Sequence, residues 1–220
     1  MKKDLYLIAG IIAVVVAGTL TAFMYYRRSQ PPVTAPVAGE VVDGRVDMGL
    51  LIGDDRPSQG PTTARVVLVE FLDPECESCR ALHPVTKTIL KEYEGKVRYV
   101  VRFMPFHANS VYAASMLEAA RIQGKFWEAL DLLFEHQPEW GSHSAPKPEL
   151  IPASLKPLKL DMAKLVEDAK NPEVAALVYR DKQDGIKAGV NGTPTFFVNG
   201  RMLRELGDAP LRAMIDEELK

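Results

Sequence analysis

Cys76 and Cys79 are the only two cysteines in the 220-residue chain, and two residues separate them. Cysteines this close together close almost no loop, so a structural disulfide between them adds little stability. A secreted scaffold held by disulfides has several cysteines spread along the chain. A structural zinc site needs more ligands, and the four histidines lack the usual His-x3–5-His spacing (His83, His107, His136 and His143). The pair therefore indicates redox chemistry, with no metal ion and no other cofactor.

The segments around the cysteines predict the context that this chemistry needs. Residues 65–72 are an apolar, β-branched run typical of a strand buried on both faces. The cysteine motif follows at once, then a predicted helix over 80–93 and a second buried strand over 97–103. A Cys-x-x-Cys between a strand and a helix is typical of redox motifs.

This position predicts different roles for the two sulfurs. At a helix N-terminus, unpaired backbone N–H groups and the helix dipole favour a negative charge. The thiolate of Cys76 is therefore expected to be stabilised, which makes Cys76 the nucleophile. Cys79 lies one turn further along the helix and is expected to resolve the mixed disulfide.

A second motif lies far down the chain, in Gly189-Val-Asn-Gly-Thr-Pro-Thr-Phe-Phe-Val-Asn-Gly200. Thr193-Pro194 precedes a short apolar strand over 195–198, and Asn199-Gly200 is a strong hairpin turn pair. A returning strand over 202–206 and a closing helix over 210–219, capped by Asp208, are expected next. Taken alone, Pro194 also fits an ordinary proline at the start of a strand.

With these motifs in this order, the chain resembles the DsbA-type branch of the thioredoxin superfamily. The similarity is carried by Glu70-Phe-Leu-Asp-Pro-Glu-Cys-Glu-Ser-Cys79, Gln123-Gly-Lys-Phe-Trp-Glu128 and Gly192-Thr-Pro-Thr-Phe-Phe-Val-Asn-Gly200. It covers about residues 64–220. It implies an α/β thioredoxin fold with a helical insertion at about 106–187, and a protein disulfide oxidoreductase.

The resemblance also implies roles for three residues outside the cysteine pair. Pro194 is expected to be cis and to lie against the cysteines, and the backbone of Thr193 to pair with a bound substrate chain as a β-strand does. Glu70 matches a buried acid that assists proton transfer at the second cysteine. The alternative is that Glu70 points to solvent from an edge strand.

The insertion is predicted to be helical over 107–123, 125–137, 162–170 and 172–185, where apolar residues recur at helical spacing. Between them, the proline-rich stretch 138–157 is expected to be a long solvated loop. Trp127 and Phe134 are interpreted as core residues.

The N-terminal region predicts a membrane anchor over 1–28 and a linker over 29–62. Leu5–Tyr26 is 22 residues without a charge, enough to span a hydrocarbon core of about 30 Å. A cleaved signal peptide is the alternative, but the run ends in Tyr-Tyr-Arg-Arg without a small-residue cleavage site. The basic residues on the two sides of this segment are nearly equal in number, so they do not decide its orientation. The redox pair favours a domain outside the cytoplasm, because disulfides persist in oxidising compartments. The linker is rich in proline and glycine, and Val46–Ile52 within it could add an edge strand.

The expected function is disulfide formation in extracytoplasmic proteins by a single-pass protein of the inner membrane, facing the periplasm or cell exterior. Unfolded or cysteine-containing secreted proteins are the expected substrates, and a membrane redox partner recycles the pair. The net charge of −2 gives no reason to expect nucleic acid as a partner.

Several alternatives remain open at this stage. Glu77 and Ser78 replace the Pro-x dipeptide frequent in the family, and Asp73 and Glu75 add negative charge near Cys76. Such anions disfavour a thiolate, which predicts an intermediate potential and leaves a reductase or isomerase possible. A Cu(I) chaperone using both cysteines and Met104 is a second alternative. A non-catalytic adaptor is a third, against which the intact motifs argue.

Overall fold

The structure is a computed structural model that describes residues 18–19, 21, 24 and 41–220. Most of the expected anchor over 1–28, and the expected linker up to residue 40, lie outside the described residues. Within the described part of the chain, no helix has the length and apolar character needed to cross a membrane.

A five-stranded sheet forms the centre of the domain, with the strand order β3-β5-β4-β6-β7. β4 lies in the middle, parallel to β5 and antiparallel to β6. The bounds of the strands are β3 Ser58–Gln59, β4 Val66–Leu72, β5 Val97–Phe103, β6 Thr195–Val198 and β7 Arg201–Met202. The three central strands match the runs of apolar residues in the sequence, because burial on both faces requires such runs. A separate hairpin pairs β1 (Val41–Val42) with β2 (Arg45–Val46).

The alternation of side chains along β4 separates two hydrophobic cores. Leu68 and Leu72 belong to the larger core, which also contains both cysteines. Val69 and Phe71 belong to a smaller core on the other face. Since side chains of a strand alternate between faces, Glu70 points to the same face as Leu68 and Leu72. The acid is therefore on the side of the sheet that carries the cysteines.

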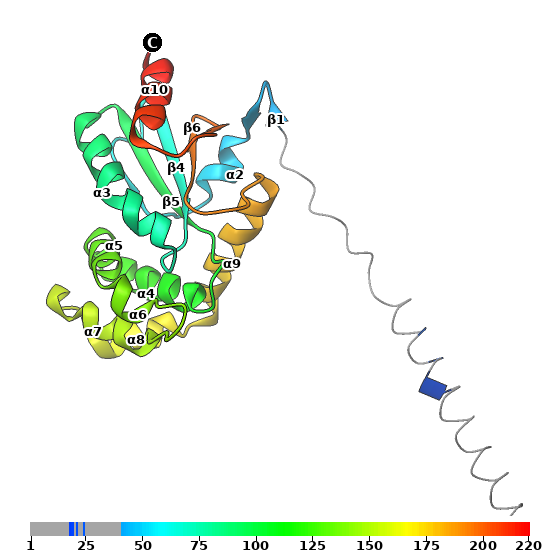
Figure 1. Ribbon diagram of the computed structural model, residues 1–220, viewed down its shortest axis with the longest axis vertical. Helices are drawn as coiled ribbons and strands as arrows, with labels where there is room; N and C mark the ends of the chain where they lie inside the picture. The colour runs from blue at the N-terminus through cyan, green and yellow to red at the C-terminus, as the bar shows by residue number, and fades with distance from the viewer. Residues whose placement is uncertain (1–17, 20, 22–23, 25–40) are drawn as a thin grey trace, which may run out of the picture. The chain divides into compact units, whose positions relative to one another are not determined.

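Helices cover both faces of the sheet and form a cluster at one end (Figure 1). α3 and α10 contribute to the larger core, and α2 contributes to the smaller one. In Figure 1, α4 to α8 gather below the sheet and α10 lies at the top. The bounds are α2 Met48–Ile52, α3 Glu77–Glu92, α4 Ser110–Ile122, α5 Phe126–Glu135, α6 Gln137–Trp140, α7 Ile151–Ser154, α8 Met162–Ala169, α9 Pro172–Lys187 and α10 Asp208–Leu219.

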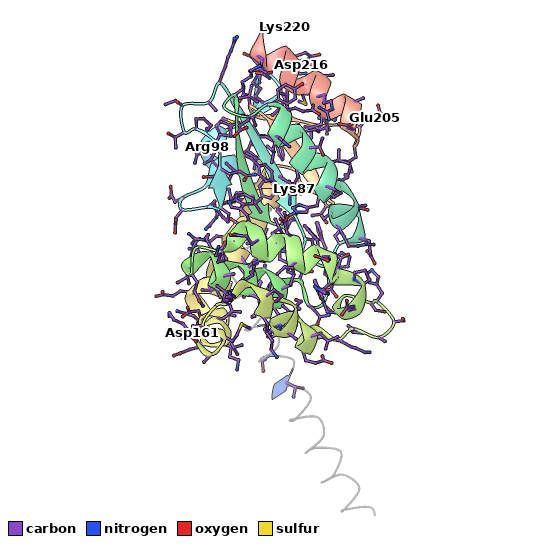
Figure 2. All side chains as sticks on the ribbon, turned by 90° about the vertical axis from the view of Figure 1, so that its left-hand side faces the viewer. Lys87, Arg98, Asp161, Glu205, Asp216 and Lys220 are labelled. Atoms are coloured by element: carbon purple, nitrogen blue, oxygen red, sulfur yellow. The ribbon has the colours of Figure 1, made fainter. Side chains whose placement is uncertain are left out.

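The view turned by 90° shows the same arrangement (Figure 2). Asp161, the N-cap of α8, lies at the helical end of the domain, whereas Asp216 on α10 lies at the opposite end. Lys87 on α3 lies between them. The insertion expected over about 106–187 is the helical layer of α4 to α9, and α3 starts three residues earlier than predicted.

Residues 46–52 do not form the edge strand that the sequence suggested. Asp47 instead accepts a hydrogen bond from the backbone N–H of Leu50 at 2.9 Å and caps the short helix α2. The edge of the sheet next to β5 is formed by β3, which is antiparallel to β5. Leu51 is fully buried in the smaller core. The second half of the expected linker therefore packs on the domain, because its apolar residues cover a face of the sheet.

The proline-rich stretch 138–157 is a solvated loop only in part: residues 142–147 are irregular and mostly exposed, whereas short helical turns lie on either side. It contains the end of α6, two 3-10 turns (Pro148–Leu150 and Lys156–Leu158) and α7. Trp140 is fully buried, and its Nε1 donates to the carbonyl of Leu133 at 3.0 Å. Prolines break this stretch into short helical pieces, but its large apolar side chains still reach the core.

The C-terminal hairpin is also shorter than predicted. Asn199 and Gly200 both have positive φ, 45° and 86°, as a tight hairpin turn requires. The returning strand β7 ends at Met202 instead of continuing to 206. The N-cap of α10 is Gly207, and Asp208 is the first residue of the helix; its side chain accepts from Arg212 Nε at 2.6 Å.

Candidate active site

The cysteine pair lies where β4 ends and α3 begins. Cys76 is the N-cap residue of α3, and Cys79 lies in the first turn of the helix. Cys76 is 8% exposed, whereas Cys79 is completely buried. The backbone N–H of Asp73 contacts the Cys79 sulfur at 3.5 Å. Of the two sulfurs, only that of Cys76 is therefore accessible to another protein, which agrees with its expected role as the nucleophile.

The surroundings of Cys76 favour its thiolate. The Cys79 side chain donates the hydrogen bond that contributes most, and this lowers the pKa of the Cys76 thiol to about 5 despite partial burial. The Thr193 side chain and the backbone N–H groups of Cys79 and Ser78 lower the pKa further. At neutral pH the sulfur is therefore ionised and reactive.

Cys79 has the opposite tendency. Burial, followed by its interactions with Cys76 and with the negative charge of Glu70, raises the pKa of the Cys79 thiol well above its usual range. A buried thiol of this kind attacks or leaves a disulfide only if a nearby group takes up or supplies the proton.

Glu70 is a buried titratable group whose charge acts on Cys79. It lies in the central strand β4 and is 2% exposed, so the alternative of a carboxylate facing solvent from an edge is wrong. Burial raises the pKa of Glu70 to about 7; a hydrogen bond from Tyr99 lowers it in part, and the charge of Cys76 raises it. Near neutral pH, such a carboxyl group can both accept and donate a proton.

The second sequence motif meets the first at Cys76. The Thr193–Pro194 peptide bond is cis, as the resemblance implied. The sulfur of Cys76 lies 3.3 Å from the carbonyl oxygen of Thr193, to which the thiol can donate. Beside them, a groove of about 540 Å³ is lined by residues that include Thr193, Pro194, Met202, Leu203 and Leu206. Thr193, whose carbonyl oxygen lies against the Cys76 sulfur, is thus also part of the wall of this groove.

The acidic residues near the pair do not oppose the thiolate as the sequence suggested. Asp73 is fully buried and accepts from the backbone N–H of Phe106 at 2.8 Å and from His107 Nδ1 at 2.7 Å. Glu75 accepts from the backbone N–H of Asn109 at 2.7 Å and from its side chain at 2.9 Å. Each carboxylate thus has its own donors, and the pKa of Cys76 is lowered, not raised.

Gln137 is a site residue that the sequence did not reveal. Its Nε2 donates to the carbonyl of Pro74 at 2.8 Å and to that of Cys76 at 3.0 Å. Its Oε1 accepts from Arg80 Nε at 3.0 Å. The side chain is buried, and it ties α6 to the turn that carries the cysteines. Nothing in its local sequence distinguishes it from a surface glutamine.

Met104, the third ligand of the copper alternative, is not at the site. It is buried in the smaller core with Phe71, on the other face of the sheet from the larger core that holds both cysteines. Met104 is therefore not placed to be a third copper ligand beside the two cysteines.

Comparison with known proteins agrees with this geometry. A family model described as Thioredoxin matches residues 54–217. A thioredoxin-like oxidoreductase from Silicibacter pomeroyi DSS-3 is 26% identical, with a TM-score of 0.68 over 78% of this chain and 97% of that one. Oxidised BdbD from Bacillus subtilis is 25% identical, with a TM-score of 0.70 over 82% and 99%. The thiol-disulfide exchange protein alpha-DsbA2 from Wolbachia pipientis, at 22% identity, shares the fold, with a TM-score of 0.65 over 77% and 90%.

Relatives in sequence include much longer proteins. The Na(+)/H(+) antiporter NhaA 3 of Salinispora tropica is 34% identical over 203 residues, which are 87% of this chain and 29% of the antiporter. The antiporter NhaA of Herminiimonas arsenicoxydans is 36% identical over 69% of this chain and 23% of its own length. The chain thus spans less than a third of these relatives. With its matched residues, its fold and the meeting of both motifs at Cys76, the chain belongs to the thioredoxin family, among the DsbA-like thiol–disulfide oxidoreductases.

Proposed function

We propose that this protein is a thiol oxidase that introduces disulfides into other proteins. The observation that carries the proposal is the contrast between the two sulfurs: the pKa of Cys76 is lowered to about 5, whereas the pKa of Cys79 is raised. A stabilised thiolate favours the reduced form of the pair, so its disulfide readily accepts two electrons. This argues against the intermediate potential that the acidic neighbours suggested.

The reaction follows from the positions of the two sulfurs. A substrate thiolate attacks Cys76 of the Cys76–Cys79 disulfide, a bond forms between substrate and Cys76, and Cys79 leaves as a thiolate that takes a proton from Glu70. A second substrate thiolate then attacks the sulfur of the substrate in this mixed disulfide, and Cys76 leaves as a thiolate. The substrate loses two electrons and gains a disulfide, and the enzyme pair is reduced.

The groove beside Thr193 supports an extended polypeptide as the substrate. Several of its lining residues are apolar, among them Pro194, Leu203 and Leu206, and Leu206 is 49% exposed. A chain lying there can pair with the backbone of Thr193 while its cysteine reaches Cys76. Unfolded or cysteine-containing secreted proteins present such segments.

The proposed location is the inner membrane, with the catalytic domain in the periplasm or at the cell exterior. The uncharged segment over residues 5–26 supports a single-pass anchor, and the proposed oxidase needs an oxidising compartment. A membrane redox partner that accepts two electrons from the reduced cysteines completes the cycle. Protease treatment of intact spheroplasts tests this location: a domain protected from protease contradicts it.

The oxidase function is tested by the potential of the pair and by turnover. Equilibration of the full-length chain with glutathione should give a potential above about −180 mV, the value of protein disulfide isomerase. The chain should also speed disulfide formation in a reduced, unfolded protein, and Cys76→Ala should abolish this activity. A potential near that of thioredoxin, about −270 mV, together with faster insulin reduction than oxidation, would instead identify a reductase.

A further inference from the structure

Three possible metal ligands meet beside the cysteine pair, although they are far apart in the sequence. Glu77 is the first residue of α3, His107 lies between β5 and α4, and His143 follows α6. One ligand atom of each side chain lies within 4.8 Å of the other two. His143 Nε2 is 2.8 Å from Glu77 Oε1, and the centroids of the two imidazole rings are 5.3 Å apart.

A buried carboxylate orients one of these histidines. His107 Nδ1 is 2.7 Å from Asp73 Oδ2, and the backbone N–H groups of Phe106 and His107 donate to the same oxygen. Because a carboxylate only accepts, Nδ1 carries the proton and Nε2 is left free to ligate. Histidines that bind metals commonly donate their other nitrogen to a carboxylate in this way, which fixes the ring and raises its basicity.

The donor set suits zinc. Two imidazole nitrogens and one carboxylate oxygen, with a fourth position open to water, form a set that Zn²⁺ takes in proteins. Metal–ligand bonds of about 2.0–2.1 Å place tetrahedral ligand atoms about 3.4 Å apart, so these atoms must move closer together. Glu77 and His143 have side chains that are 53% and 58% exposed, and these can rotate at little cost.

We propose that Glu77, His107 and His143 form a zinc-binding site next to the redox pair. Zinc there links α3 to the segments before α4 and after α6. Because the ion binds the folded chain and not the unfolded one, the free energy of unfolding rises with the logarithm of the zinc concentration once that concentration exceeds Kd. The proposal rests on the geometry of the three side chains and is independent of the direction of electron flow at the cysteines.

The test uses the full-length chain, without an affinity tag and with the Cys76–Cys79 disulfide formed, so that sulfur cannot ligate the ion. Zn²⁺ is titrated by calorimetry and by competition with a chromophoric chelator, and thermal unfolding is followed with and without Zn²⁺. We expect one zinc per chain and a higher Tm in its presence. His107→Gln and His143→Gln should each weaken zinc binding at least tenfold and remove the rise in Tm.

His136→Gln is the matched control. His136 Nδ1 is 2.9 Å from Glu139 Oε1, which makes it a surface histidine–carboxylate pair outside the proposed site. This variant should bind zinc as the unaltered chain does. The proposal is overturned if the oxidised chain binds no zinc, or if His136→Gln weakens binding as much as His143→Gln. Should His107→Gln fail to fold, the exposed His143→Gln decides alone, and unchanged zinc binding by it overturns the site.

Discussion

The hydroxyl of Tyr99 donates a hydrogen bond to the carboxylate of Glu70, and both side chains are buried in the larger core. Tyr99 lies on β5 and Glu70 on the neighbouring strand β4. Both groups interact electrostatically with Cys79. The hydrogen bond from Tyr99 stabilises the ionised form of Glu70, the residue proposed to exchange a proton with Cys79.

Tyr99→Phe is expected to shift the pH dependence of resolution upward. The hydrogen bond from Tyr99 lowers the pKa of Glu70, so its loss should raise that pKa above about 7 and leave less carboxylate at neutral pH. The measurement is the rate at which Cys79 releases glutathione from a mixed disulfide at Cys76, across pH. Tyr112→Phe, a half-buried tyrosine of α4, should keep the original midpoint. Equal midpoints in both variants would contradict the role of Tyr99.

Glu70→Gln is expected to change how stability depends on pH. Burial raises the pKa of Glu70 from 4.5 to about 7, so between these values the folded state holds a proton that the unfolded state has lost. Stability therefore falls as pH rises through this window, by about 3 kcal/mol for this group. Glutamine does not titrate. In urea unfolding of the reduced forms, the free energy of unfolding of the variant should rise relative to that of the unaltered chain between pH 5 and pH 8. A difference that does not change with pH would contradict the prediction.

Replacing Cys79 is expected to raise the pKa of Cys76. The hydrogen bond from the Cys79 side chain is the largest contribution that lowers it to about 5. Cys79→Ala removes this donor, whereas Cys79→Ser keeps an O–H group in nearly the same place. Thiolate absorbance at 240 nm should give the higher midpoint for alanine and a smaller shift for serine. Identical midpoints in both variants would show that the helix terminus alone sets the pKa.

Gln137→Ala is expected to destabilise the turn before α3. It leaves the carbonyl groups of Pro74 and Cys76 without the donor that both share, inside a buried region. The loss should lower the free energy of unfolding by about 1–3 kcal/mol. Gln123→Ala is the control, because its hydrogen bonds to the backbone of Asp161 are exposed and should cost about 0.5 kcal/mol or less. Urea unfolding compares the two variants.

Much of the site could be predicted because its parts are local. Cys76 and Cys79 lie between a buried strand and a helix, and Thr193-Pro194 begins another strand, all within short stretches of sequence. Unbroken apolar runs predicted the bounds of β4, β5 and β6 to within one residue, since a strand buried on both faces needs such a run. The prediction was wrong for Val46–Ile52, where a capping aspartate starts a short helix. For 138–157 it was right only for the exposed residues 142–147, because Trp140 and Ile151 are buried.

By itself, the sequence determined the redox pair, the order of the motifs and the family of the chain. Only the tertiary structure decided the electrostatic environment of the pair. Tyr99, Gln137, His107 and His143 come from four separate segments, and the nearby acids are matched with donors more than thirty residues away. The physical reason is that a pKa depends on burial and on neighbours in space, neither of which a local pattern specifies.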